Sequence, residues 1–144
     1  MLVRRSTTAA AAVTLWLALV ASCAPATVTT PPPGVALGMS YTDGRVHLGA
    51  TLTCLSGRET ASGFLVHRSA ALLCRRARAL RGFLGAPPDR GRLCSQVYGG
   101  PDRALVRGRV GTTPVHRWFG RADGCQIADW RRAALLLPRP GATP

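Results

Sequence analysis

The stretch from Leu93 to Pro101 contains the residues best suited to chemistry with a partner molecule. It is short and extended in character, has Cys94 near its start and ends at Gly99, Gly100 and Pro101. A segment of this length cannot bury a core of its own, so other elements must hold it rigid. We interpret it as a displayed loop and the rest of the chain as its frame.

Motifs for catalysis or cofactor binding are absent from the sequence. It contains no paired acidic constellation, glycine-rich phosphate loop, set of metal ligands or nucleophile motif. The three histidines, His47, His67 and His116, are scattered, and a lone histidine is usually structural. We therefore expect a protein that is not an enzyme and that carries no cofactor or metal ion.

The first 23 residues have the pattern of an export signal. Arg4 and Arg5 form a positive region, and the apolar region 9–20 is too short to span a bilayer comfortably. Residues 20–23 resemble the bacterial lipobox, whose cysteine becomes the lipidated first residue. We predict a signal peptide over 1–23 with lipidation at Cys23, and export to the cell surface or the extracellular space. The alternative is an ordinary signal peptide cleaved near 24–26.

The cysteine count agrees with this division. Five cysteines are an odd number, and removing Cys23 leaves four: Cys54, Cys74, Cys94 and Cys125. Four cysteines in an exported domain imply two disulfides, for which three connectivities exist. A zinc site is the competing interpretation, but the sequence has no Cys-x-x-Cys or paired-histidine spacing.

The charge is strongly basic. All nineteen basic residues are arginine, and without Arg4 and Arg5 seventeen remain against six acidic residues, a net charge of +11. Such a balance suggests nucleic acid or anionic surfaces. The aromatic interleaving of a single-strand binder is missing, however, and export argues against DNA. We interpret the arginines as the coding bias of a GC-rich genome, and expect no nucleic-acid partner and membrane attachment by the lipid anchor alone.

Two hairpins are predicted to form the frame. After a Pro/Thr-rich tether over 24–34, apolar residues alternate over 35–41 and 46–54, with a turn at Asp43-Gly44 between them. A second pair of alternating segments covers 104–110 and 115–119, with a turn near Gly111-Thr112.

The remaining segments are predicted to be one long helix, one short helix and a last strand. Residues 55–68 are expected to form an irregular loop, followed by a helix capped by Ser69 whose apolar stripe runs from Leu73 to Leu84. A short helix over 126–132, a strand over 133–137 and a flexible tail over 138–144 complete the chain. The fold class is α+β: a single antiparallel sheet of about five strands with two helices.

Four short patterns over 35–137 together resemble the subtilisin inhibitor-like family of bacterial secreted protease inhibitors. They are Thr51–Cys54, His67 seven residues before Cys74, Cys94–Tyr98 followed by Pro101, and Arg117–Phe119 followed by Cys125. The first resembles the family's Leu-Thr-Cys strand end, and the third resembles its reactive loop, a cysteine followed by Pro-x-Val-Tyr-Asp-Pro.

The resemblance implies the pairing of the cysteines and the position of the reactive bond. It implies bridges Cys54–Cys74 and Cys94–Cys125, a scissile bond between Gln96 and Val97, and a homodimer formed through the sheet face. The loop residues that it places against a protease are Leu93, Cys94, Ser95, Gln96, Val97 and Tyr98.

The loop departs from the family pattern at several positions. Ser95 stands where proline is usual, Gly99 and Gly100 replace an acidic residue, and Arg68 replaces the proline after the histidine. Gln96 stands where relatives use Met, Leu, Lys or Arg. These changes bear on the strength of inhibition more than on the fold.

The function that the resemblance implies is inhibition of an extracellular, subtilisin-like serine protease by a substrate-like loop. An uncharged Gln96 disfavours trypsin-type enzymes, whose pocket carboxylate selects Arg or Lys. The alternative function is a lipoprotein binding module of the same fold that has lost tight inhibition. A further alternative for Val97 and Tyr98 is burial as core residues of a strand.

Overall fold

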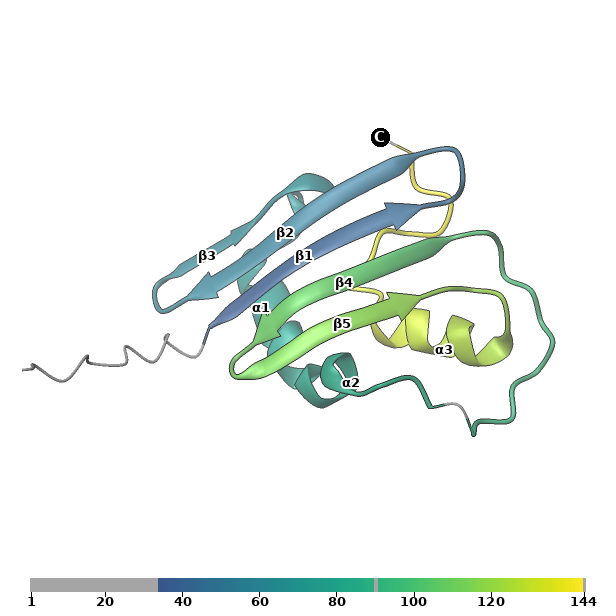
Figure 1. Cartoon of the computed structure of the whole chain (residues 1–144). Coiled ribbons are helices and arrows are strands. Elements are labelled where there is room, and N and C mark those ends of the chain that lie inside the picture. The colour runs from purple at the N-terminus through teal and green to yellow at the C-terminus, as the bar shows by residue number, and fades with distance from the viewer. Residues whose placement is uncertain (1–33, 90, 144) are drawn as a thin grey trace, which may run out of the picture.

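The computed structural model describes residues 34–89 and 91–143 (Figure 1). The predicted signal peptide, the lipidation site Cys23 and residues 24–33 of the tether lie outside the described residues. Within the described ranges, no helix is long and apolar enough to cross a bilayer.

The two predicted hairpins form the centre of the sheet. One joins β1 (Val35–Thr42) to β2 (His47–Leu55), and the other joins β4 (Arg103–Val110) to β5 (Thr113–Phe119). β1 and β4 pair antiparallel and join the hairpins, and β3 (Arg58–Ala61) adds an edge strand beside β2. The strand order is β3-β2-β1-β4-β5.

The helices cover one face of the sheet because alternate strand residues on that face are apolar. In β1, for example, Val35, Leu37, Met39 and Tyr41 are all buried. α1 (Ala70–Ala79) packs against β2 and β3, whereas α2 (Arg81–Gly85) and α3 (Gly124–Arg132) pack against β5. Figure 1 shows the helices on one side of the sheet, with the chain between α2 and β4 passing outside β5 and α3.

The predicted fold class is confirmed. The structure has one five-stranded antiparallel sheet, two helices of seven or more residues, and two disulfides. Two disulfides in a small domain are compatible with an exported protein. Within the described residues, the hydrophobic core and the partly buried residues packed against it lie between Val35 and Ala142.

Two predictions about residues 55–85 need correction. The segment expected as an irregular loop contains strand β3 and a short 3-10 helix, η1 (Gly63–Leu65), because Gly57 turns the chain back with a positive φ of 74°. The predicted apolar stripe is buried, but the helix is interrupted at Leu80, whose ψ of 6° separates α1 from α2.

The predicted last strand over 133–137 is wrong. This apolar run forms turns that bury Ala133, Leu136 and Leu137 instead of pairing with a strand. The guanidinium of Arg68 donates hydrogen bonds to the carbonyl oxygens of residues 134, 135 and 137, at 3.2, 2.6 and 3.1 Å. An arginine therefore satisfies carbonyl groups that a neighbouring strand would otherwise have paired.

Candidate functional site

The Leu93–Pro101 loop is exposed along the residues predicted to form its site. From Arg92 to Gly100 the chain has no helix, strand, turn or bend. Leu93 is fully exposed, Val97 and Tyr98 are 58% and 67% exposed, and Gln96 is exposed as well. Val97 and Tyr98 are therefore not core residues, and the Gln96–Val97 bond is open to a partner.

A disulfide and a backbone hydrogen bond hold the loop before Gln96. Cys94 is bonded to Cys125 in the first turn of α3, with a Cα–Cα distance of 5.3 Å. The N–H of Gly124 donates to the carbonyl oxygen of Ser95 at 2.9 Å. We call these two links the upstream support, and they end one residue before the predicted scissile bond.

The second disulfide lies away from the loop. Cys54 and Cys74 are both completely buried, and their bond joins β2 to α1. Both pairings implied by the family resemblance are thus confirmed. The exposed loop depends directly on only one of the two bridges.

A second set of contacts holds the loop after Tyr98. The N–H of Gly99 donates to the carbonyl oxygen of Arg121 at 2.8 Å. A methyl group on Gly99 would lie only 2.8 Å from Cδ1 of Ile127, and Gly100 has a φ of +127°, which favours glycine. Of the two glycines that depart from the family pattern, Gly99 therefore fits a close approach to α3, and Gly100 fits a left-handed backbone conformation beside Asp102. We call these contacts the downstream support.

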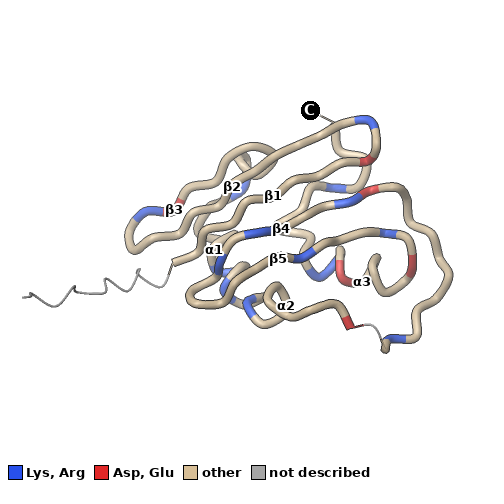
Figure 2. Tube along the Cα trace, viewed as in Figure 1, with Lys and Arg blue, Asp and Glu red and all other residues tan. Residues whose placement is uncertain are grey.

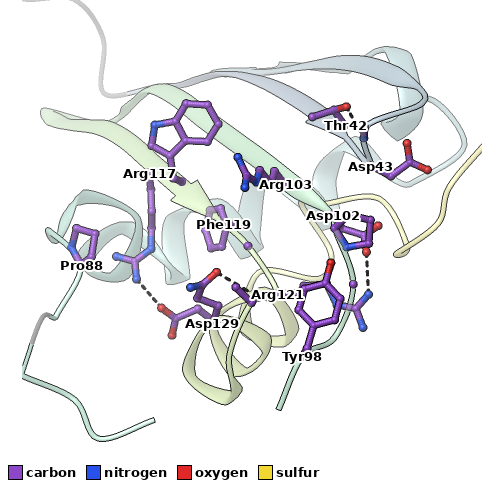
Figure 3. Close-up of a pocket in the computed structure, with 17 residues that line it drawn as sticks. Thr42, Asp43, Pro88, Tyr98, Asp102, Arg103, Arg117, Phe119, Arg121 and Asp129 are labelled. Atoms are coloured by element: carbon purple, nitrogen blue, oxygen red, sulfur yellow. Dashed lines mark hydrogen bonds and ion pairs between the residues drawn. The ribbon is translucent and has the colours of Figure 1, made fainter. Parts of the chain in front are cut away.

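Asp102 fixes the end of the loop to three other parts of the chain. Its carboxylate is almost fully buried and accepts hydrogen bonds from the Tyr41 hydroxyl at 2.7 Å and from the Gly141 N–H at 2.8 Å. It also pairs with the guanidinium of Arg121 at 2.9 Å (Figure 3). The Gly141 contact joins the 138–143 segment, predicted to be a flexible tail, to the start of β4.

These contacts shift the pKa values of both buried partners. Burial alone would raise the pKa of Asp102, but hydrogen bonds from Tyr41, Gly141 and Arg121 outweigh it and hold the pKa below the ordinary 3.8. Burial, followed by the hydrogen bond to Asp102, raises the pKa of Tyr41 to about 12. At neutral pH the pair is thus a carboxylate and a protonated phenol.

The first turn of α3 is stiffened by its own capping contacts. The carboxylate of Asp123, at the N-cap, accepts from the N–H and the side-chain amide of Gln126, both at 2.8 Å. The side-chain oxygen of Gln126 in turn accepts from the N–H of Ala122 at 3.3 Å. Because Arg121, Gly124 and Cys125 flank this cap, both supports of the loop rest on one ordered turn.

A buried arginine connects the approach to the loop with the frame. Arg117 is 6% exposed and donates to the carbonyl oxygens of Phe83 and Ala86, each at 2.9 Å. It also pairs with Asp129 of α3 at 3.0 Å, and Asp129 accepts from Arg92 at 2.9 Å. These bonds hold the segment that leads into the loop against β5 and α3.

An open groove of ≈ 770 Å³ lies beside the loop. Tyr98, Asp102 and Arg121 line one end, and Arg117 and Asp129 line the other (Figure 3). The groove separates Tyr98 from the edge strand β5, so the side chain of the second residue after the predicted scissile bond faces open space.

One cluster has the residue types of a metal site. Atoms of Cys94, Asp123 and Cys125 lie within 4.8 Å of one another. The two sulfur atoms are bonded to each other, however, and the sulfur species that binds metals is the thiolate. The cluster is therefore part of the loop support.

The structure brings the predicted loop residues together and adds others that hold them. Between the supports, only Gln96, Val97 and Tyr98 span the gap. The supporting roles of Asp102, Arg121 and Gly124 were not predicted from the sequence. One local signal was present: Asp123 followed three residues later by Gln126 is typical of a helix N-cap.

Comparison of the chain with protein-family models, curated proteins and solved structures finds no match.

Proposed function

We propose that this protein is an exported inhibitor of subtilisin-type serine proteases that presents Gln96–Val97 as a substrate-like bond. The proposal rests on one observation: the exposed segment Gln96–Tyr98 lies between the upstream support, which ends at Ser95, and the downstream support, which begins at Gly99. We propose the cell surface, through lipidated Cys23, or the extracellular space as its location.

A rigid loop binds more tightly than a free peptide of the same sequence. Fixing the backbone of one residue costs about 1–2 kcal/mol, so a free peptide loses much of its contact energy in becoming ordered. Here the disulfide and the Gly124 and Gly99 hydrogen bonds impose that order before binding. Most of the contact energy then remains available for affinity.

The proposed chemistry is reversible acyl transfer. The protease serine bonds to the carbonyl carbon of Gln96 while its proton passes to the protease histidine. The bond to the Val97 nitrogen breaks, and the new amine takes that proton. Attack by this amine on the acyl-enzyme restores the peptide and frees the serine, whereas attack by water leaves a nicked chain.

The fold favours the reverse reaction because a nick does not separate the two pieces. One piece carries β1–β3, α1 and α2, and the other carries β4, β5 and α3. The Cys94–Cys125 bridge and the whole β1–β4 ladder, from Val35 opposite Val110 to Thr42 opposite Arg103, join them across the cut. The amine at Val97 stays near the acyl group, since Gly99 is held two residues away.

The side chains of the loop have separate roles in this proposal. Gln96 enters the primary pocket of the protease, and a broad apolar pocket accepts its uncharged side chain at reduced affinity. Leu93, which is fully exposed, fills a second apolar subsite upstream. Val97 and Tyr98 lie on the leaving-group side, and strand pairing between the backbones adds affinity that is independent of sequence.

Titration of the chain from Ala24 to Pro144 against subtilisin, chymotrypsin and trypsin tests the proposal. We expect stoichiometric, slowly reversible inhibition of subtilisin and none of trypsin. Gln96→Met strengthens inhibition about tenfold because an apolar side chain fits the pocket better. Thr60→Met, which adds the same residue at an exposed position of β3, leaves inhibition unchanged.

The alternative, a binding module that has lost inhibition, predicts a different result. In that case subtilisin is not inhibited and Gln96→Met does not create inhibition. That outcome contradicts the inhibitor proposal, and Ser95 and the two glycines of the loop are the departures from the family pattern that would account for it.

A further inference from the structure

The outer face of the sheet carries a row of arginines on β4. Arg103, Arg107 and Arg109 lie at alternate positions and are exposed, on the face opposite the helices. The strand rise of about 3.3 Å per residue spaces Arg107 and Arg109 by roughly 7 Å. Figure 2 shows basic positions along β4, the strand next to the edge strand β5.

No Asp or Glu occupies an outward-facing position on the five strands of the sheet. All six acidic residues are within the described ranges, and the ion pairs found there use only Glu59, Asp102 and Asp129. Asp43 and Asp123 cap a turn and a helix. None of the described ion pairs involves a β4 arginine, so these three positive charges have no ion-pair partner in the part of the chain that the structure describes.

The β4 arginines have small residues beside them on β1 and an exposed aromatic side chain beside them on β5. On β1, Arg107 lies opposite Gly38 and Arg109 lies opposite Ala36, so no large side chain covers them there. On β5, Trp118 is 60% exposed and lies opposite Leu105, between Arg103 and Arg107 in register. The face therefore combines guanidinium groups with an exposed indole.

We propose that this outer sheet face binds the anionic headgroups of a phospholipid bilayer. Guanidinium groups form paired hydrogen bonds with phosphate oxygens, and exposed arginines are attracted to a negatively charged leaflet. An indole is the side chain that favours the boundary between water and lipid, since one edge is polar and the rest apolar. The small neighbours Ala36 and Gly38 leave the guanidinium groups of Arg109 and Arg107 open to such a surface.

The chemistry of the face disfavours two other occupants. The homodimer through the sheet face that the family resemblance implies would bring the same arginines of two copies into one interface, with no Asp or Glu from an outward-facing strand position of either copy. Single-stranded nucleic acid is held by several large stacking aromatics, and Trp118 is the one Trp, Tyr or Phe side chain on the strand positions of this face, beside the smaller rings of His47 and His116.

The same orientation leaves the reactive loop accessible. β1 starts at Val35, which pairs with Val110 next to Arg109, so the predicted lipid-anchored segment joins the sheet at the arginine row. The Leu93–Pro101 loop passes outside β5 and α3, at the edge of the molecule (Figure 1). A bilayer against the outer sheet face would therefore not cover the loop.

Vesicle binding tests the proposal on the unlipidated chain from Ala24 to Pro144, which contains the whole core. The probes are phosphatidylcholine vesicles with and without phosphatidylglycerol, at low and physiological salt. We expect binding only to the phosphatidylglycerol vesicles, weakened by salt. The triple variant Arg103→Gln/Arg107→Gln/Arg109→Gln binds about a hundredfold more weakly, because each arginine near an anionic surface contributes about a fivefold gain.

A matched control removes the same charge elsewhere. Arg75→Gln/Arg81→Gln/Arg131→Gln changes three exposed arginines on the helices and leaves vesicle binding nearly intact. Trp118 fluorescence shifts to shorter wavelength on binding, and Trp118→Phe removes the shift because Trp130 is buried. The proposal would be overturned if both triple variants lost the same amount of vesicle binding, or if the unmodified chain did not bind the vesicles. It would also be overturned if the chain preferred single-stranded DNA to vesicles, or if it self-associated through the β4 arginines.

Discussion

Asp102 is the residue at which three distant parts of the chain meet the end of the loop. It accepts hydrogen bonds from Tyr41 of β1 and Gly141 of the last segment, and it pairs with Arg121. A loop that must keep its shape after cleavage needs such a fixed end. Asp102 therefore contributes both to stability and to the geometry of the loop.

The pKa of Asp102 predicts a loss of stability in acid. Its folded pKa lies below the unfolded 3.8, so its stabilisation is complete above about pH 5, begins to fall near pH 3.8 and is lost as the pH falls through the lower folded pKa. Asp102→Asn removes this stabilisation and lowers the free energy of unfolding at pH 7 by about 2 kcal/mol. It also makes the free energy of unfolding depend less on pH in acid. Urea unfolding at several pH values measures both effects. If the free energy of unfolding of the variant depends on acid pH as strongly as that of the unmodified protein, this role of Asp102 is contradicted.

Gly100 is expected to be required for loop shape. Gly100→Ala places a side chain at φ +127° and 2.8 Å from the Asp102 carboxylate, a strain of about 1–2 kcal/mol that the loop can relieve only by moving. Inhibition of subtilisin should weaken by about tenfold. Gly57→Ala, at φ +74° in the β2–β3 turn, lowers stability but leaves inhibition unchanged. Equal inhibition by both variants would show that Gly100 does not shape the loop.

The sequence predicted the exposed residues of the loop better than the residues that support it. Leu93 to Tyr98 were identifiable from Cys94 and the family resemblance. Asp102 and Arg121 were not identifiable, because their partners are distant in sequence. In an arginine-rich chain, the sequence also does not distinguish an arginine that forms an ion pair from one that is only solvated. Only the register of β1 against β4 brings Tyr41 near Asp102.

At the level of elements, the start of α3 is the platform for the loop. Asp123→Ala removes the N-cap acceptor and should cost about 1 kcal/mol in the free energy of unfolding. Because the same turn carries both supports, inhibition should weaken as well. Chemical unfolding and inhibition titration measure the two effects.

The matched control is the cap of another helix. The hydroxyl of Ser69 accepts from Leu72 at the start of α1, away from the loop, so Ser69→Ala should lower stability without weakening inhibition. If the two cap variants weaken inhibition equally, the effect is global and α3 is not a specific platform.

Periodicity predicted the elements whose side chains alternate and failed where the apolar residues are continuous. Both central hairpins were predicted because one face of each strand is buried. The run from Ala133 to Leu137 has no period, and Arg68, whose reach cannot be inferred locally, satisfies its carbonyl groups. β3 was missed because its four residues are polar or small and gain their strand structure from β2.

At the scale of the whole molecule, the two disulfides should have different roles. They join residues 20 and 31 positions apart, and each stabilises the fold by roughly 3–4 kcal/mol in the chain-entropy model. If the proposed function holds, Cys94→Ala/Cys125→Ala should turn the loop from an inhibitory segment into a substrate cleaved at Gln96–Val97. Cys54→Ala/Cys74→Ala should lower stability by a similar amount and retain inhibition, as measured by thermal unfolding and by titration below the unfolding temperature.

A reversal of these disulfide effects would count against the loop as the functional site. If removal of the buried bridge abolished inhibition in a folded protein while removal of Cys94–Cys125 did not, rigidity beside Gln96 would be irrelevant.

We propose that the two supports hold the Gln96 carbonyl and the Val97 amine in place for religation after the bond between them is cut. The most direct measurement starts from the chain nicked at this bond and adds a catalytic amount of subtilisin. Mass spectrometry after reduction then follows the intact chain over time. We expect intact chain to reappear and to reach the same ratio to nicked chain as when the intact protein is the starting material. If the nicked chain stays nicked and the intact chain is cleaved to completion, the loop is a substrate and the account is wrong.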